Sequence, residues 1–505
     1  MVSRRFPPLH PFLLAAACSL LALGCPASGG GDDGGPTEAQ LDSQLRSLIA
    51  LEGLTGRPEL IAEANGIAIP DVSDPLVQLG MRLFFTKSLG GDFTVSCASC
   101  HHPLLGGGDG LTLSIGVDTV DPDLLGPGRT QRSDAVGYDG GPNVPRNAPT
   151  TFNVALWKDA LFWDGRVRRN PNGSGIITPD SAGPTASDPQ AGNSLATAQA
   201  RFPVTSNEEM RSHTFEVGAD NDTVRAHLAG RIGDYGLGAG EITEDWLPLF
   251  REAFDDPTGT AEELIHYGTI AEAIAAYEHS QFFVDNPWNR YVLGDDDALT
   301  PAQKRGALLF FRSPEAGGAG CVGCHSGDFF TDERYHDIAM IQVGRGKGDL
   351  NGSGAPTQDW GRRRTSGDPS DTYAFRTPTL LNVEVTGPYG HSGAYSTLEG
   401  VIRHHLDPVA ALASYDTAQL DPGVQTADLI ENTQEALDLL LASQAVGASM
   451  LPTGIELTEA EIADLVAFLE ALTDPRVEDP VALEPWIPRN DSSFVDSQLL
   501  DARFE

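Results

Sequence analysis

Two short cysteine motifs carry the most specific chemistry in this sequence. The first is Cys97-Ala-Ser-Cys100-His101 and the second, far along the chain, is Cys321-Val-Gly-Cys324-His325. Two thiols at this spacing can form thioether bonds to the two vinyl groups of one haem, and the adjacent histidine then lies under the iron. The sequence therefore predicts two covalently bound haems c, with His101 and His325 as the proximal iron ligands.

Zinc and a redox-active dithiol are the alternatives for these cysteines. A zinc site usually needs four protein ligands, and the other cysteines are Cys18 and Cys25. A dithiol leaves both histidines unexplained. Each motif also follows an apolar segment and a glycine pair, and this duplication favours haem. The neighbouring His102 has no such spacing and is expected to be a loop residue.

Helix start signals precede both motifs. Asp74-Pro75 combines a cap residue with a proline suited to the first turn, and Thr300-Pro301-Ala302-Gln303 is a capping box. A second capping box at 458–461 starts a later helix. The predicted apolar faces are Leu76, Leu79, Leu83 and Phe84 for the first helix, and Ile462, Leu465, Val466, Leu469 and Leu472 for the last.

The composition excludes several classes of protein. Of the 505 residues, 40% are hydrophobic and 21% charged, which is typical of a folded soluble protein and excludes global disorder. The 56 glycines and 35 prolines indicate long loops. The net charge of −38 repels phosphate backbones, so no nucleic-acid partner is expected.

The first residues resemble an export signal. Arg4 and Arg5 precede an apolar run that ends Leu21-Ala22-Leu23-Gly24-Cys25, similar to a lipobox. We expect a lipoprotein-type signal peptide over 1–24 and a flexible tether over 25–40, with a plain secretory signal as the alternative. The protein is then exported, periplasmic and attached to a bacterial membrane only through a lipid anchor.

These signals together predict a mainly α fold with two cytochrome c-like haem domains, long loops and few strands. The expected boundaries are 41–290 for an N-terminal haem c domain and 291–475 for a C-terminal haem c domain. A C-terminal tail over 476–505 follows.

The residues around both motifs resemble the bacterial di-haem cytochrome c peroxidase and MauG family. The resemblance covers roughly residues 70–410 and rests on short motifs in a common order. They are Asp109-Gly110, Ser114-Ile115-Gly116, Arg146-Asn147-Ala148-Pro149-Thr150, Phe162-Trp163-Asp164-Gly165-Arg166, Gly361-Arg362, Phe375-Arg376-Thr377-Pro378-Thr379, Thr386-Gly387-Pro388-Tyr389-Gly390-His391 and Thr397-Leu398-Glu399. Four segments resemble insertions: 118–142, 167–198, 211–260 and 410–455.

This resemblance implies roles for the residues of the first haem. The first haem would react with peroxide and the second would supply its electrons. Glu209 matches the distal carboxylate, which moves a proton from the near peroxide oxygen to the leaving one. Gln199 and Pro203 match the rest of that pocket, and Trp163 matches the tryptophan between the haems.

The resemblance also implies a calcium ion and a distal ligand for the second haem. Asn147, Thr386 and Pro388 match calcium-coordinating positions, and their oxygens suit a hard cation. The distal ligand, a methionine in peroxidases and a tyrosine in MauG, falls on His405. His404 and the thioether of Met340 remain alternatives.

One further position departs from the family pattern and bears on the function. Val117 stands where a histidine can cap the first iron, so an open first haem is expected. The leading expectation is an oxidoreductase of the cytochrome-c peroxidase type, which reduces hydrogen peroxide to water with electrons from a small exported carrier, a cytochrome c or a copper protein. The alternatives are a MauG-like oxidase that modifies a partner protein and a non-catalytic electron-transfer haem lipoprotein. Family members often form homodimers, and the sequence leaves this open.

Overall fold

The structure is a computed structural model that describes residues 36–349, 357–452, 454–489 and 496–504. The expected signal peptide over 1–24 and most of the tether lie outside the described residues. From Glu38 onward the chain packs as a single unit. The boundaries expected at 290 and 475 stay predictions. In the described ranges, no helix combines the length and hydrophobicity needed to cross a bilayer.

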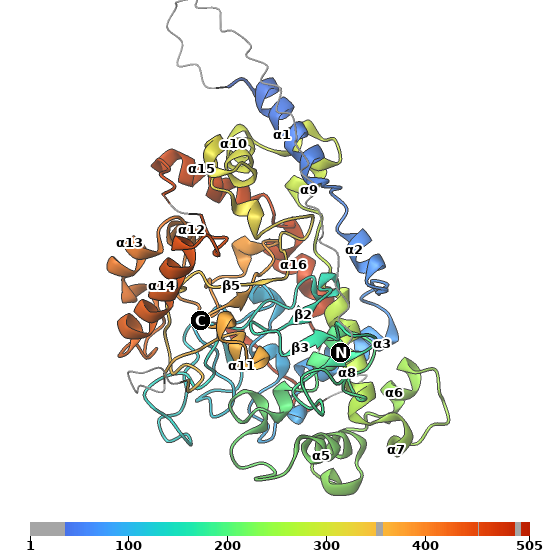
Figure 1. Ribbon diagram of the computed structural model, residues 1–505. Coiled ribbons are helices and arrows are strands. Elements are labelled where there is room, and N and C mark those ends of the chain that lie inside the picture. The colour runs from blue at the N-terminus through green and yellow to red at the C-terminus, as the bar shows by residue number, and fades with distance from the viewer. Residues whose placement is uncertain (1–35, 350–356, 453, 490–495, 505) are drawn as a thin grey trace, which may run out of the picture. The chain divides into compact units, whose positions relative to one another are not determined.

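The described part of the chain is mainly helical (Figure 1). The helices are α1 (Glu38–Glu52), α2 (Glu59–Ala64), α3 (Pro75–Phe85), α4 (Leu195–Gln199), α5 (Asn221–Gly233), α6 (Leu247–Ala253), α7 (Ala261–Leu264), α8 (Tyr267–Ser280), α9 (Pro287–Val292), α10 (Pro301–Phe311), α11 (Arg363–Ser366), α12 (Leu398–Leu406), α13 (Pro408–Ala413), α14 (Leu429–Ala445), α15 (Glu459–Glu470) and α16 (Pro480–Leu483).

The strands of the described residues are two or three residues long and form three small sheets. Parallel β1 (Leu124–Leu125) and β7 (Arg503–Phe504) make one, and antiparallel β5 (Tyr335–His336) and β6 (Phe375–Arg376) make another. The third is an antiparallel sheet in the order β2 (Ala160–Leu161), β3 (Val167–Arg169) and β4 (Ile176–Ile177). The expectation of a mainly α fold with few strands is confirmed, whereas the layout of two haem domains stays a prediction.

The two helices that precede the cysteine motifs pack in the same way. Helix α3 packs against α8, and α10 packs against α15. At the sixth position of each leading helix is a glycine, Gly80 or Gly306. A Cβ there would lie 1.8 Å from a backbone oxygen of the partner helix, that of Ala273 or Asp464. Only glycine allows such an approach, so the two halves share a contact that local sequence patterns do not reveal.

The predicted helix starts agree with the structure. Capping boxes are present at Thr300 with Gln303 and at Thr458 with Glu461. Asp74 occupies the N-cap position of α3 without a side-chain cap bond, and it accepts instead from the Asp71 N–H. The expected stripe of α15 is correct except at its end, because Leu472 lies beyond the last helical residue.

The apolar core forms two large clusters and smaller ones. One large cluster includes buried residues of α3, α5 and α8, and the other includes those of α1, α10 and α15. A smaller cluster lies among α12, α13 and α14, so the expected insertion over 410–455 adds helices beside α12. The expected insertion over 211–260 contributes α5 and α6.

Candidate functional site

Both cysteine motifs open on one cavity of about 390 Å³. The segments that line it come from distant parts of the chain, including the ends of α4 and α12 and the loops after α3 and α10. Apart from the alternative ligand His404, the candidate site residues named from the sequence line this cavity: Cys97, Cys100, His101, Asn147, Trp163, Gln199, Pro203, Glu209, Cys321, Cys324, His325, Thr386, Pro388 and His405. The fold therefore brings these residues together, while their roles stay predictions.

Each motif folds as one tight turn. The first turn begins at Cys97 and the second at Cys321, both as 3₁₀ helices. In both turns, the backbone N–H of the histidine donates to the backbone carbonyl of the first cysteine, at 3.1 Å for His101 and 2.9 Å for His325. This turn holds both thiols and the imidazole at one wall of the cavity, as attachment of a haem requires.

The two motif histidines are oriented in the same manner. Nδ1 of His101 lies 3.2 Å from the Gly107 carbonyl oxygen, and Nδ1 of His325 lies 3.2 Å from that of Phe330. A carbonyl partner fixes the proton on Nδ1 and leaves the Nε2 lone pair for a metal. Burial lowers the pKa of both imidazoles, to about 4 for His325, so both are neutral as iron ligands must be.

The cysteines do not form a zinc site in the described residues. All four motif thiols are free, and the group of metal-ligating side chains found there is Cys324 with Asp332 and His336. That group lacks a fourth ligand and leaves Cys321 out. Burial also raises the pKa of the Cys100 and Cys321 thiols to about 12, so both are neutral when no metal is bound. The donor set fits haem c better than zinc.

Glu209 is held on a single turn of π-helix, Asn207–Arg211. The Ser206 hydroxyl caps this turn by accepting from the Glu209 N–H at 3.4 Å. Such turns are rare and often occur at functional sites. The Glu209 carboxylate lies 4.0 Å from Nη2 of Arg166, whose guanidinium stacks over the Phe162 ring at 3.4 Å. The carboxylate and a fixed positive charge thus line the cavity together.

Gln199 and Pro203 reach the same cavity through a sharp change of direction. Gln199 is the last residue of α4, and its carbonyl accepts from the Phe202 N–H at 3.0 Å. Pro203 then begins a 3₁₀ helix, where its fixed φ suits the first position. The short turn places both side chains beside the segment that carries Glu209.

Trp163 links the two halves of the chain. Its indole N–H donates to the Asn147 carbonyl at 3.0 Å, and its own carbonyl accepts from the Arg376 N–H at 2.9 Å. Arg376 also donates from Nε to the Phe162 carbonyl at 3.1 Å. The ring is therefore fixed between a loop of the first half and a strand of the second.

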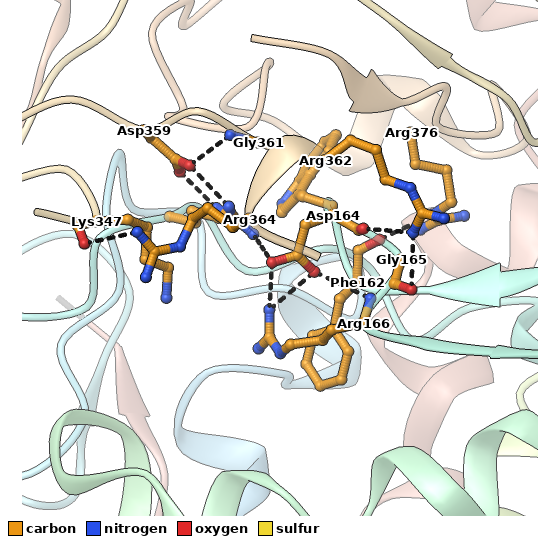
Figure 2. A network of polar contacts seen from close by, with 12 residues as sticks. Phe162, Asp164, Gly165, Arg166, Lys347, Asp359, Gly361, Arg362, Arg364 and Arg376 are labelled. Atoms are coloured by element: carbon orange, nitrogen blue, oxygen red, sulfur yellow. Dashed lines mark hydrogen bonds and ion pairs between the residues drawn. The ribbon is translucent and has the colours of Figure 1, made fainter. Parts of the chain in front are cut away.

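A buried ion network explains several of the family motifs. Arg146 donates to Asp164 at 2.8 Å and, through two nitrogens, to Asp359 at 2.6 and 2.8 Å. Figure 2 shows Asp164 and Asp359 in this network, with Arg362 donating to the carbonyls of Asp164 and Gly165. Sequence reasoning missed Asp359, because no local spacing couples it to Arg146; its place just before Trp360-Gly361-Arg362 is the signal that could have found it.

The three expected calcium positions all supply neutral oxygens. The Asn147 side chain donates from Nδ2 to the Leu111 carbonyl at 2.9 Å, which leaves its Oδ1 as an acceptor. Its backbone N–H donates to the His391 carbonyl, which brings it near the loop of Thr386 and Pro388. Carbonyl, amide and hydroxyl oxygens fit calcium chemically, and none of the three is a carboxylate.

The structure separates the candidate ligands of the second haem. His405 has Nδ1 at 2.8 Å from the Val401 carbonyl oxygen, so Nε2 is left for iron, and it lines the cavity. His404 lies outside that lining, and both of its ring nitrogens have partners. Met340 lines the cavity and stays an alternative. The geometry favours His405 over His404.

Two further residues named from the sequence are buried outside the lining of this cavity. Val117 is fully buried in the core cluster with α3 and α8, outside the cavity lining, and its N–H donates to the Glu208 carbonyl at 3.2 Å. His102 lies in a loop as expected, but it is 1% exposed and caps the 3₁₀ helix Pro103–Leu105.

A helical fold in which two Cys-x-x-Cys-His turns open on one cavity defines a di-haem oxidoreductase. The family model for di-haem cytochrome c peroxidase matches residues 74–297. Methylamine utilization protein MauG of Methylorubrum extorquens is 30% identical over 375 residues, which are 74% of this chain and 79% of that protein. Cytochrome c551 peroxidase of Pseudomonas aeruginosa is 29% identical over 403 residues, 79% of this chain and 88% of that protein. The chain belongs to the di-haem cytochrome c peroxidase and MauG family, as the sequence motifs predicted.

Solved structures agree with this assignment. A MauG-like protein associated with microbial copper homeostasis matches with a TM-score of 0.52 and 26% identity, covering 83% of this chain and 95% of that chain. The diheme peroxidase BthA of Burkholderia thailandensis has a TM-score of 0.50 at 21% identity, covers 81% of this chain and 88% of that chain, and shows a likeness of fold alone.

Proposed function

We propose that this protein reduces hydrogen peroxide to water with electrons from a small exported carrier, a cytochrome c or a copper protein. The observation that supports this best is the place of Glu209. Its carboxylate lines the same cavity as His101, on a rare π-helical turn and near the guanidinium of Arg166. A carboxylate over an open iron is the group that peroxide cleavage needs.

Haem c, when bound, supplies an iron that coordinates a peroxide oxygen and accepts electrons one at a time. Glu209 takes the proton from the near oxygen of peroxide and returns it to the leaving oxygen. The Arg166 guanidinium adds positive charge where negative charge develops on that oxygen. Gln199 and Pro203 form the wall that orients peroxide beside the carboxylate.

The electrons enter through the second half of the chain in this proposal. His325 and His405 hold the second haem, and Trp163 lies between the two halves, where an aromatic ring shortens electron tunnelling. A calcium ion held by Asn147, Thr386 and Pro388 stabilises this junction. Export to the periplasm with a lipid anchor at Cys25 completes the proposal, and the net charge of −38 attracts a basic carrier protein.

The test is peroxide turnover of the Glu209→Gln variant in the mature di-haem protein. Because the amide cannot accept the proton, turnover should fall by about 10² to 10⁴-fold, with both haems still attached. Glu208→Gln is the matched control, since Glu208 is adjacent in sequence and outside the cavity lining, and it should keep full turnover. Full turnover of Glu209→Gln would overturn the proposal.

A MauG-like oxidase that modifies a partner protein is the second candidate. It is favoured by the 30% identity to a MauG and by the fold match to a MauG-like protein. The two candidates share the first haem and differ in the electron source. Peroxide consumption that continues with a small reduced carrier as the sole donor supports the peroxidase, whereas consumption that depends on one partner protein supports the oxidase.

A further inference from the structure

His404 has a partner for each ring nitrogen, which sets it apart from its neighbour His405. Nε2 lies 2.9 Å from the Ile338 carbonyl oxygen, which can only accept, so Nε2 carries the proton. Nδ1 is then a bare acceptor, and the Tyr395 hydroxyl donates to it at 2.9 Å. The backbone thus fixes the histidine tautomer that can receive a phenol proton.

His404 and Tyr395 are buried beside His405, the expected ligand of the second haem. His404 is 0% and Tyr395 5% exposed. The rings of His404 and His405 are 6.0 Å apart between centroids, and those of His404 and Tyr395 are 5.3 Å apart. The His404 ring therefore lies between Tyr395 and His405, the residue that we expect to ligate the second iron.

A second tyrosine, Tyr415, contacts Tyr395 and is more exposed to solvent. The Tyr415 ring meets the Tyr395 ring edge to face, with 5.6 Å between centroids. Tyr415 is half-buried, and its hydroxyl donates to the Ala394 carbonyl rather than to a base. Of the two tyrosines, only Tyr395 has a hydrogen bond to a group that can take its proton.

We propose that Tyr395 is a redox-active residue of the second haem, with His404 as the positioned acceptor of its proton and Tyr415 as the outward relay. This inference rests on the proposed peroxide reaction, which supplies the oxidant. When no donor is present, the oxidising equivalents that peroxide leaves on the haems remove one electron from Tyr395. The phenol proton moves to Nδ1 of His404, and a neutral tyrosyl radical remains.

The step balances without another reactant. One electron passes from the phenol to the oxidised haem, which is reduced by one equivalent, and the O–H bond breaks as an N–H bond forms on His404. Return of one electron, from the haem or through Tyr415 from outside, restores the phenol as the proton moves back. The arrangement stores an oxidising equivalent in the protein or carries it toward the surface.

The experiment is freeze-quench electron paramagnetic resonance of the oxidised holoenzyme mixed with hydrogen peroxide in the absence of donor. We expect an organic radical that narrows when the protein contains ring-deuterated tyrosine and that is lost in Tyr395→Phe. Tyr373→Phe is the matched control, since Tyr373 is equally buried in the same core cluster, and its hydroxyl bonds Gln358 and Glu435 rather than a histidine. It should keep the radical.

His404→Gln tests the proton acceptor, because an amide accepts a hydrogen bond without taking the proton. The rate of radical formation should fall by about 10²-fold or more. The low-spin signal of the second haem, recorded in each variant, shows that ligation by His405 is intact. In Tyr415→Phe the radical should form normally and decay more slowly with added reductant.

The outcomes separate this inference from the proposed function. If peroxide is not consumed and the haem spectrum does not change, the proposed function fails. If peroxide oxidises the haems of the wild type and no tyrosine radical forms, or if the radical persists unchanged in Tyr395→Phe, the inference is overturned and the pair serves packing alone. An unchanged rate in His404→Gln removes His404 as acceptor, and unchanged decay in Tyr415→Phe removes the relay.

Discussion

Arg146 and Asp359 form two parallel hydrogen bonds, from Nε at 2.6 Å and from Nη2 at 2.8 Å, although they lie in opposite halves of the chain. Both side chains are nearly inaccessible, at 6% and 5% exposure. The third arm of the guanidinium donates to Asp164, which belongs to the same motif as Trp163. One buried cation therefore holds the loop that carries Trp163 against the second half of the chain.

Arg146→Met should destabilise the protein strongly. It leaves the buried Asp359 carboxylate without its cation and Asp164 with only the longer contact to Arg166, at 3.3 Å. Removing one partner of a buried ion pair typically costs about 3–5 kcal/mol. Chemical denaturation at neutral pH, with both haems attached, measures the loss. Arg132→Met is the control, because the Arg132 pair with Asp134 is exposed and such pairs contribute about 0–1 kcal/mol. Equal losses of unfolding free energy in the two variants would show that the buried triad of Arg146, Asp164 and Asp359 does not hold the two halves of the chain together.

The same triad predicts an acid-dependent stability. Burial alone would raise the pKa of Asp359, but the Arg146 guanidinium outweighs it and holds that pKa at about 2. A depressed pKa means that the contribution is full above the unfolded value of about 3.9 and is lost as pH falls toward 2. The free energy of unfolding should fall between about pH 4 and pH 2 more steeply in the wild type than in Arg146→Met. An equal fall of the unfolding free energy with pH in the two proteins would contradict a depressed pKa of Asp359 caused by Arg146.

His405→Gly should convert the second haem from low-spin to high-spin, because its distal imidazole is removed. Optical and electron paramagnetic resonance spectra of the oxidised protein report the change. His404→Gln is the control and should remain low-spin, since both nitrogens of His404 are already engaged. A low-spin spectrum that survives in His405→Gly would move the ligand to Met340.

Trp163→Phe should slow electron transfer from the second haem to the first. It removes the indole and its 3.0 Å bond to the Asn147 carbonyl. Pre-reducing the second haem and mixing with peroxide allows its reoxidation to be followed. Trp486→Phe, outside the cavity lining, should leave the rate unchanged. Equal rates in both variants would place the electron path elsewhere.

The helices and haem turns of the site were predictable because their determinants are local. Thr300 with Gln303 and Thr458 with Glu461 fix helix starts within four residues, and each Cys-x-x-Cys-His turn is a single hydrogen-bonded unit. The family motifs placed Glu209 and Trp163 at one cavity because their order was matched together.

The features that could not be predicted from the sequence depend on packing between residues far apart in the chain. Gly80 and Gly306 can be read from the sequence of the two helices, α3 and α10. Their role, close approach to the backbone of a partner helix, is known only from the structure. The carboxylate of Asp359 reaches Arg146 from the opposite half of the chain. His404 and His405 are alike in sequence, and only the carbonyl of Ile338 and the hydroxyl of Tyr395 distinguish them.

The most direct test of peroxide reduction at the first haem is stopped-flow mixing of the fully oxidised di-haem protein with hydrogen peroxide, without prior reduction. We expect an immediate spectral change at the first haem, since Val117 offers no ligand and Glu209 lines the cavity. In Glu209→Gln the change should be slower by about 10² to 10⁴-fold. An oxidised protein that ignores peroxide until one electron has been added, or one that reacts equally fast without the Glu209 carboxylate, would contradict the proposed function.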